Sequence, residues 1–133
     1  MKKIFTLLLV IIFGVTQAQV FSQTEDNFIH YLNETNFKKG IQKGVVVVEF
    51  NAPFNLNNSF SEWKQIEHCR YYRVCIDRSP DLKEKYKIWA VPTIVVFQNG
   101  HVEKKFTGNI MLEIDIETKQ LQETVDELYL DKF

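Results

Sequence analysis

Two cysteines, Cys69 and Cys75, are the side chains of this 133-residue chain with the greatest capacity for covalent chemistry. Five residues separate them, so they do not form the Cys-x-x-Cys pair in which one thiolate attacks a disulfide and the second resolves the product. The spacing places one cysteine at a helix–strand junction and the other inside the strand. Two interpretations remain open, a structural disulfide between them or two buried thiols. A redox function of this pair is less favoured than either.

Metal and phosphate chemistry have little support in the sequence. His68 lies beside Cys69, but a structural zinc site needs four ligands and no second close pair of cysteine or histidine is present. Gly-rich phosphate loops, nucleophile elbows and metal-binding helix motifs are absent from the sequence. We therefore expect no metal ion and no other cofactor.

A tetrapeptide rich in asparagine, Asn55-Leu56-Asn57-Asn58, lies shortly after the apolar segment Val45–Phe50 and directly before an expected helix start at Ser59. The free N–H groups of a helix N-terminus, together with the amides, would donate hydrogen bonds to a ligand carbonyl or carboxylate. The simpler alternative is that Asn58 and Ser59 only cap the helix, because Asn and Ser are common capping residues.

The surrounding hydrophobic pattern predicts alternating helices and strands. Strands are expected at Val45–Phe50, Tyr72–Ile76, Thr93–Gln98 and Val102–Thr107, with Asn99-Gly100 as the turn of a hairpin. Helices are expected after the capping residues Thr24–Asn27, from Ser59 with Phe60, Trp63 and Ile66 as its buried face, from Ser79-Pro80, and over Glu117–Tyr129. Alternation over residues 110–116 suggests a further extended segment. This order predicts an α/β fold in which parallel central strands are extended by an antiparallel hairpin, with helices on both faces.

Two stretches resemble thioredoxin and protein disulfide isomerase domains: Glu49-Phe50-Asn51-Ala52-Pro53-Phe54 and Ile88-Trp89-Ala90-Val91-Pro92-Thr93. The resemblance covers about Val20 to Tyr129. It implies a thioredoxin fold, with a central mixed sheet, helices on both faces and a cis-proline before the strand that enters the edge hairpin. The catalytic Cys-x-x-Cys of the family would stand at Asn55-Leu56-Asn57-Asn58, where amides cannot form a thiolate. The resemblance therefore implies a domain without catalytic residues.

The resemblance also implies a binding surface. In the family, the backbone of the residue before the cis-proline pairs with an extended substrate peptide, and this chain has Val91 there. Trp89, Phe54 and Leu56 would form an apolar rim, with ordinary packing as the alternative for Trp89. The candidate ligand-binding residues are Phe54, Asn55, Leu56, Asn57, Asn58, Trp89, Val91 and Pro92. Glu49 matches the buried acid of the family; with no thiol to serve, we expect it to be structural or paired with a lysine such as Lys87.

The first eighteen residues have the composition of an export signal. Lys2 and Lys3 precede an apolar stretch from Ile4 to Phe13, and the small-residue site Thr16-Gln17-Ala18 follows. The apolar stretch is shorter than the roughly twenty residues of a membrane-spanning helix, although a retained anchor remains the alternative. We predict a signal peptide at residues 1–18 and one thioredoxin-like domain at residues 19–133, exported to a periplasm or secreted.

Charge and composition narrow the class of partner. Without Lys2 and Lys3, 14 basic residues stand against 17 acidic ones, a net charge of −3 that favours neither nucleic acid nor an anionic membrane. The sequence thus favours an exported, non-catalytic protein that binds an extended peptide or a partner protein. Two alternatives stay open: a thiol–disulfide oxidoreductase using Cys69 and Cys75, and a structural or assembly subunit with its interface on another face.

Overall fold

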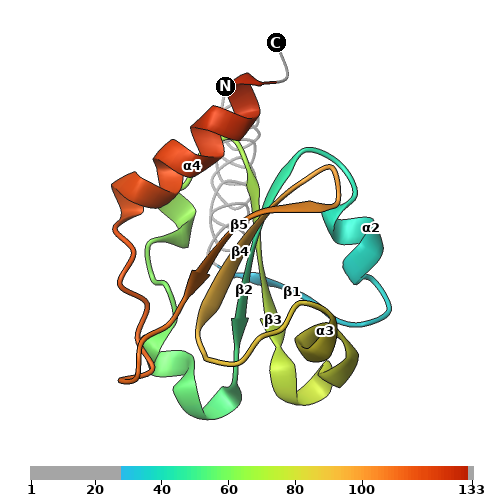
Figure 1. Cartoon of the computed structure of the whole chain (residues 1–133), viewed down its shortest axis with the longest axis vertical. Helices are drawn as coiled ribbons and strands as arrows, with labels where there is room; N and C mark the ends of the chain where they lie inside the picture. The colour runs from blue at the N-terminus through green and yellow to red at the C-terminus, as the bar shows by residue number, and fades with distance from the viewer. Residues whose placement is uncertain (1–27, 132–133) are drawn as a thin grey trace, which may run out of the picture.

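The computed structural model describes residues 28–131, which form a five-stranded sheet with helices on both faces (Figure 1). The strands in spatial order are β1 (His30–Leu32), β3 (Arg70–Cys75), β2 (Val45–Asn51), β4 (Thr93–Gln98) and β5 (His101–Thr107). β1, β3 and β2 run parallel, whereas β4 and β5 are antiparallel additions. The predicted α/β fold with a mixed central sheet is therefore confirmed.

The β2 strand is buried along its whole length, as its run of valines predicts. Side chains alternate between the two faces of a strand. One face packs against α2 (Phe37–Ile41) and α3 (Pro80–Lys85), and the other packs against α4 (Thr118–Leu130). Both layers are thus anchored on the same central strand.

The second half of the chain follows its sequence pattern closely. The β4 strand and the β5 hairpin form as expected, and the turn residues Asn99 and Gly100 have φ values of 50° and 86°, which suit a two-residue hairpin turn. The Asn99 side chain also accepts a hydrogen bond from the Gly44 N–H at 2.9 Å. The helices expected at Pro80 and near the C-terminus are α3 and α4.

The prediction of a helix after Thr24–Asn27 is wrong over the residues that the structure describes. Its capping residues, Thr24–Asn27, lie outside the described residues, but its last part forms β1, which pairs with β3 in parallel. Three residues at a sheet edge are too few to show a period of two. The short helix α2 was not predicted, and residues 110–116 form turns and irregular structure instead of an extended segment.

The helix expected at Ser59 is also replaced, in this case by the short 3-10 turn η2 (Trp63–Gln65). Both side chains of its predicted capping box bond elsewhere. Ser59 Oγ accepts a hydrogen bond from Asn51 Nδ2 at 3.0 Å, and the Glu62 carboxylate accepts one from the Thr118 hydroxyl. Phe60 and Ile66 are nevertheless buried, so the apolar pattern was correct and the helical geometry was not.

Among the helices within residues 28–131, none is both long enough and apolar enough to cross a membrane.

Candidate functional site

Three connections meet at one end of the sheet, the lower end in Figure 1. They are η1 (Pro53–Asn58), which follows β2, the loop 89–92 before β4, and the loop 108–113 after β5. The Gly108 N–H donates to the Pro92 carbonyl at 2.8 Å, and Asn55 Nδ2 donates to the Leu112 carbonyl at 3.1 Å. These bonds hold the three connections together, and with them every residue of the predicted binding surface.

The predicted polar loop is occupied by its own hydrogen bonds. Asn55 is 3% exposed, and its amide donates both to Leu112 and to Asn51 Oδ1, the latter at 3.1 Å. Asn58 Nδ2 donates to Asn55 Oδ1 at 3.0 Å. An amide nitrogen has two hydrogens, so Asn55 has no donor left for a ligand. The structural interpretation of Asn55 and Asn58 is favoured, although they bond to each other and to β2 instead of capping an α-helix.

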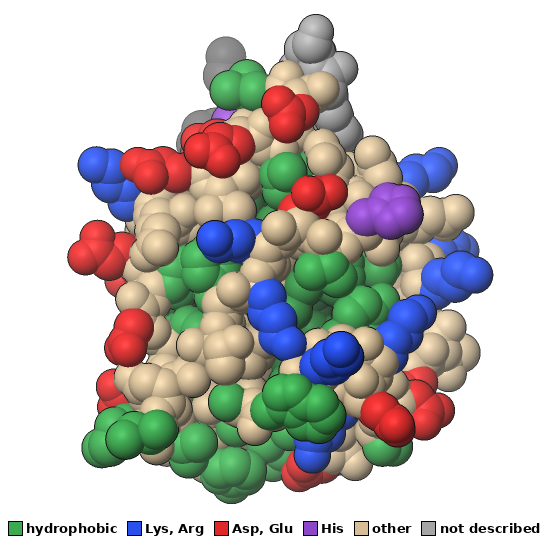
Figure 2. All heavy atoms as spheres, in the orientation of Figure 1, with side chains coloured by type: hydrophobic (Ala, Val, Ile, Leu, Met, Phe, Trp, Pro, Cys, Tyr) green, Lys and Arg blue, Asp and Glu red, His purple; other side chains and the backbone are tan. Residues whose placement is uncertain are grey.

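The apolar rim is exposed, in contrast to the asparagines. Phe54 is 72% exposed, Trp89 75% and Leu56 43%. Ile110, Met111 and Leu112 extend this rim from the loop 108–113, and Ile110 is 97% exposed. In Figure 2, hydrophobic side chains gather along the same lower edge of the molecule. Sequence reasoning missed Ile110–Leu112, because it interpreted their alternation as a strand.

The Val91-Pro92 step follows Trp89 of this rim and is joined to the loop 108–113 through Gly108. Its peptide bond is cis, and the side chains of both residues are buried. No hydrogen bond from residues 28–131 reaches the backbone N–H or C=O of Val91, whereas the Pro92 carbonyl is used by Gly108. Lys105 Nζ fixes the preceding loop by donating to the carbonyls of Tyr86 and Lys87 at 3.0 and 2.7 Å.

Glu49 is fully buried behind η1 on the face of the sheet that carries α4. Its carboxylate accepts hydrogen bonds from the Tyr71 hydroxyl at 2.8 Å, the Phe60 N–H at 3.2 Å, and Arg73 Nη2 and Asn51 Nδ2 at 3.3 Å. The expected partner Lys87 is wrong, because Arg73 comes from the neighbouring strand at the position directly opposite Glu49. Four donors satisfy a charge that would otherwise be costly to bury.

The charges in this cluster also change how its members titrate. Burial, and then the charge of Glu49, raises the pKa of the Tyr71 hydroxyl well above its usual value. Burial alone would lower the pKa of Arg73, but the charge of Glu49 and hydrogen bonds to Tyr31 and Glu49 outweigh it and raise that pKa. Tyr71 therefore stays neutral and Arg73 stays charged over the physiological range.

The two cysteines are free thiols at opposite ends of β3. An extended strand rises about 3.3 Å per residue, which puts their Cα atoms on the order of 20 Å apart, against about 6 Å in a disulfide. The possible disulfide between Cys69 and Cys75 is therefore excluded in this fold. Burial, reinforced by Asp126, raises the pKa of Cys69 to about 12 and holds it as a thiol.

No group of three or more His, Cys, Asp or Glu side chains is placed to hold a metal ion within the described part of the chain. His68 instead stacks on Tyr129 with ring centroids 4.5 Å apart, and its Nδ1 lies 3.2 Å from Asp126 Oδ1.

Comparison with known proteins places this geometry in a family. The thioredoxin family model matches residues 28–125. A thioredoxin of Chlamydia trachomatis serovar D is 23% identical over 95 residues, which are 60% of this chain and 84% of that protein. A mutant thioredoxin from Halobacterium salinarum superposes with a TM-score of 0.61 at 16% identity, covering 78% of this chain and 92% of its own. Mitochondrial thioredoxin 3 of Saccharomyces cerevisiae gives a TM-score of 0.59 at 21% identity, covering 75% of this chain and 95% of its own. The chain therefore belongs to the thioredoxin family.

Proposed function

We propose that this protein is an exported, redox-inactive member of its family that binds an extended peptide, or an extended segment of a partner protein, without forming a covalent bond. The partner lies along the loop 89–92 and pairs with the backbone of Val91. Its apolar side chains pack on the exposed rim formed by Phe54, Leu56, Trp89 and Ile110–Leu112. Residues 1–18 direct export and are removed.

The observation that carries this proposal is the unpaired backbone of Val91. Buried backbone N–H and C=O groups are nearly always hydrogen-bonded, so a residue whose two groups find no partner within residues 28–131 is a natural place for strand addition. The residue lies beside an apolar rim, where large side chains such as Trp89 remain open to solvent. Main-chain pairing supplies affinity and the rim supplies specificity for apolar side chains.

The absence of redox chemistry in the proposal rests on the thiols. The loop that follows β2 carries asparagine at both ends of its Asn55–Asn58 stretch, and Cys69, at the opposite end of β3, is held protonated. Cys75 lies nearer to this loop, but it has no second thiol within reach to resolve a mixed disulfide. The purified chain should therefore show no thiol-dependent reduction of insulin. Turnover that disappears on changing Cys69 or Cys75 to serine would establish the oxidoreductase alternative instead.

Binding is tested by NMR titration of isotopically labelled protein with extended peptides, and with any partner captured from the envelope of the native host. Amide shifts should begin at Leu56, Trp89 and Val91, while signals of the distant helix residues Val125 and Leu128 stay unchanged. Shifts that cluster on α4 would favour an assembly interface there instead of peptide binding at the loop 89–92. Export is tested separately by the intact mass of the native protein, which should begin at Gln19; retention of Met1 would contradict cleavage.

A further inference from the structure

A cavity lies at the same end of the sheet as the exposed rim. None of its lining residues belongs to the loops 89–92 and 108–113. Its volume is about 480 Å³, within the usual range for a small-molecule site. The walls come from the carboxyl ends of β1, β2 and β3, from η1, and from η3 (Ile76–Arg78). Leu56 lies between this hollow and the apolar rim, and it is the one residue of the predicted peptide site that lines both.

The chain path explains why a hollow opens here. After β2 the chain moves onto the face that carries α4, where Phe60 and Ile66 pack with Leu121. After β3 it moves to the opposite face, where Leu82 of α3 packs with α2. Neighbouring parallel strands that send their connections in opposite directions leave a crevice outside their carboxyl ends, and open α/β sheets bind ligands at that position.

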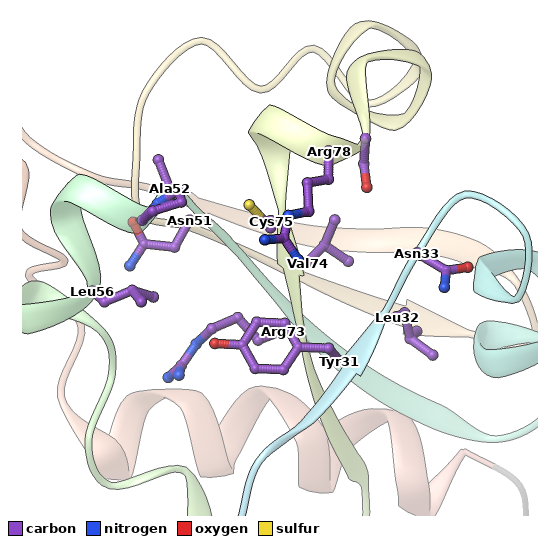
Figure 3. Close-up of a pocket in the computed structure, with 12 residues that line it drawn as sticks. Tyr31, Leu32, Asn33, Asn51, Ala52, Leu56, Arg73, Val74, Cys75 and Arg78 are labelled. Atoms are coloured by element: carbon purple, nitrogen blue, oxygen red, sulfur yellow. The ribbon is translucent and has the colours of Figure 1, made fainter.

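The charge of the hollow favours an anion. Its lining includes two arginines, Arg73 and Arg78, and no aspartate or glutamate; the charge of Arg73 is paired with Glu49 behind the lining, whereas that of Arg78 is not paired within residues 28–131. Arg78 is exposed and makes no salt bridge with any residue in the described range. In Figure 3 its side chain reaches back from η3 towards Cys75 and Val74.

Arg73 is 9% exposed and only partly satisfied. Its Nη2 donates to Glu49 at 3.3 Å, whereas its buried Nε has no acceptor among residues 28–131. A buried guanidinium with a spare donor is unusual, because such groups normally bind protein, ordered water or a ligand. Planar guanidinium groups match the geometry of a carboxylate, which accepts two parallel hydrogen bonds.

The remaining wall sets the size and polarity of the ligand. Leu32, Ala52, Leu56 and Val74 give the hollow an apolar side, and Tyr31 lies across from them beside Arg73 (Figure 3). We propose that this cavity binds a small organic carboxylate whose acidic group is held by Arg78 and Arg73 and whose apolar body packs against Leu32, Leu56 and Val74. The carboxylate belongs to a free acid or to the C-terminal residue of a peptide. This site is independent of peptide pairing at Val91.

Cys75 provides a direct report of occupancy, because it lines the cavity and Cys69 does not. Titration of the purified chain with 4-phenylbutyrate should slow iodoacetamide modification of Cys75 severalfold, as measured by peptide mass spectrometry. The neutral analogue 4-phenylbutyramide should give little protection. Equal protection by the acid and the amide, or none by any carboxylate up to 10 mM, would overturn the proposal.

Variants separate specific from general effects of charge. Arg78→Gln should weaken protection by 4-phenylbutyrate roughly tenfold, the scale expected for one hydrogen bond to a charged group. Arg70→Gln removes the same charge from the exposed start of β3, outside the cavity, and should leave the affinity unchanged. Equal losses in the two variants would show only general electrostatics and would reject the site.

The source of the carboxylate is resolved with short peptides that end in phenylalanine. A peptide with a free C-terminus that protects Cys75 better than both its amide and 4-phenylbutyrate identifies a chain terminus as the ligand. Stronger protection of Cys75 by 4-phenylbutyrate than by the peptide identifies a small free carboxylic acid as the ligand instead. Protection of Cys75 without shifts at Trp89 and Val91 would show that this site is separate from the proposed peptide site at the loop 89–92.

Discussion

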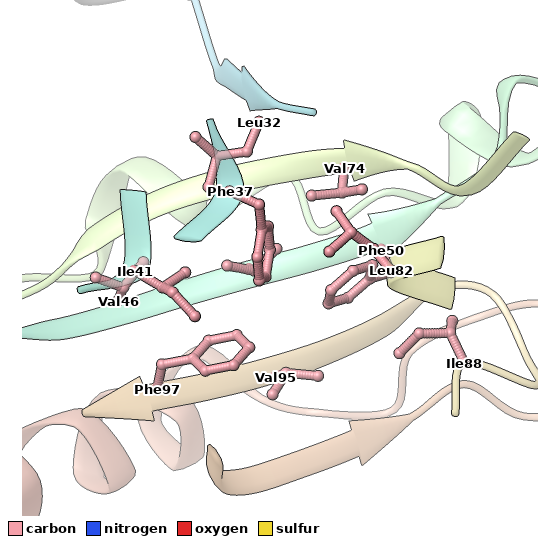
Figure 4. Packing of buried hydrophobic residues seen from close by; sticks show 11 residues of the cluster. Leu32, Phe37, Ile41, Val46, Phe50, Val74, Leu82, Ile88, Val95 and Phe97 are labelled. Atoms are coloured by element: carbon pink, nitrogen blue, oxygen red, sulfur yellow. The ribbon is translucent and has the colours of Figure 1, made fainter. Parts of the chain in front are cut away.

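The two faces of the central sheet are built on different principles. On the side of α2 and α3 a cluster of apolar residues is buried, with Phe37, Phe50 and Phe97 at its centre (Figure 4). On the side of α4 the same strands bury Glu49 and Arg73 among the valines. The first face is held mainly by the packing of apolar side chains, whereas the second also buries charged groups, each of which needs a partner.

The two faces also differ in how they contact the loop after β2. The apolar face needs nothing from the loop after β2. On the polar face, Asn51 links Glu49 to η1, donating to both the Glu49 carboxylate and Ser59 Oγ. Asn55 then continues these bonds to the loop 108–113. The side chains of Asn51 and Asn55 in this part of the chain are therefore used in hydrogen bonds within the domain, whereas the rim side chains Phe54 and Trp89 stay exposed.

Removal of Arg73 should break the polar face with the largest effect. Arg73→Leu leaves Glu49 charged and buried without its cation, and losing one partner of a buried pair costs about 3–5 kcal/mol of the free energy of unfolding. Urea denaturation of the variant measures this loss. Adding Glu49→Gln should recover most of it, because glutamine is neutral and still accepts the hydrogen bonds of Tyr71 and Phe60. A loss below about 1 kcal/mol, or no recovery, would mean that the pair is dispensable.

Alkaline pH should weaken the same face next. Cys69 has a native pKa of about 12 against 9.0 for a free thiol, so above pH 9 the unfolded chain loses its proton while the native chain keeps it. The contribution of this group is complete below pH 9 and is lost progressively as the pH rises towards 12. Between these two pKa values, one thiol lowers the free energy of unfolding by about 1.4 kcal/mol per pH unit. Urea midpoints at pH 8, 9 and 10 measure it.

A matched variant assigns this slope. Cys69→Ala should remove most of the dependence between pH 9 and 10; a smaller part remains from Tyr71, whose ordinary pKa is 10.0 and whose native pKa is raised. Cys75→Ala serves as the control and should keep the slope of the parent chain. An unchanged slope in Cys69→Ala would show that the thiol is not buried as described.

The β2 strand, the hairpin and the start of α3 were predictable from sequence, because local pattern determines them. A run of valines, an Asn-Gly turn and a Ser-Pro helix start each act over a few residues. The polar face was not predictable, because its bonds join distant positions. Ser59 and Glu62 match a capping box locally, yet they bond to Asn51 and Thr118, and tertiary partners override the local helix signal.

The candidate site divides in the same way. The exposed rim residues Phe54 and Trp89 follow from the family resemblance, since their positions next to η1 and Pro92 come with the fold. The pairing of Glu49 with Arg73 instead of Lys87 depends on strand register, which the sequence does not display. Both cysteines were placed correctly near β3, but only the length of the strand shows that they cannot meet.

Asn55→Ala should have an intermediate effect that separates structure from binding. The substitution removes two donors, which leaves the Leu112 carbonyl without a partner and Asn51 Oδ1 with the Ala52 N–H alone, at about 2 kcal/mol in the free energy of unfolding. Asn57→Ala, at an exposed position of the same loop, should change stability by less than about 0.5 kcal/mol. Equal effects of the two substitutions would show that η1 is not held by the Asn55 bonds.

Substitutions in the rim should have the smallest effect on stability but should lower the affinity for a peptide. Trp89→Ser and Ile110→Ser replace side chains that are 75% and 97% exposed, so little buried surface is lost and the free energy of unfolding should change by less than about 0.5 kcal/mol. Affinity for an extended apolar peptide should nevertheless fall roughly tenfold or more, because exposed aromatic anchors account for much of the binding energy at such surfaces.

Val102→Ser on β5, 49% exposed and outside the rim, is the matched control for a lost exposed apolar side chain and should leave affinity unchanged. Isothermal titration with one peptide across the three variants, beside urea denaturation of each, measures both quantities. If Trp89→Ser lowered stability as much as Asn55→Ala and left the affinity for the peptide unchanged, the rim would serve packing. The proposal that the rim binds peptide would then be wrong.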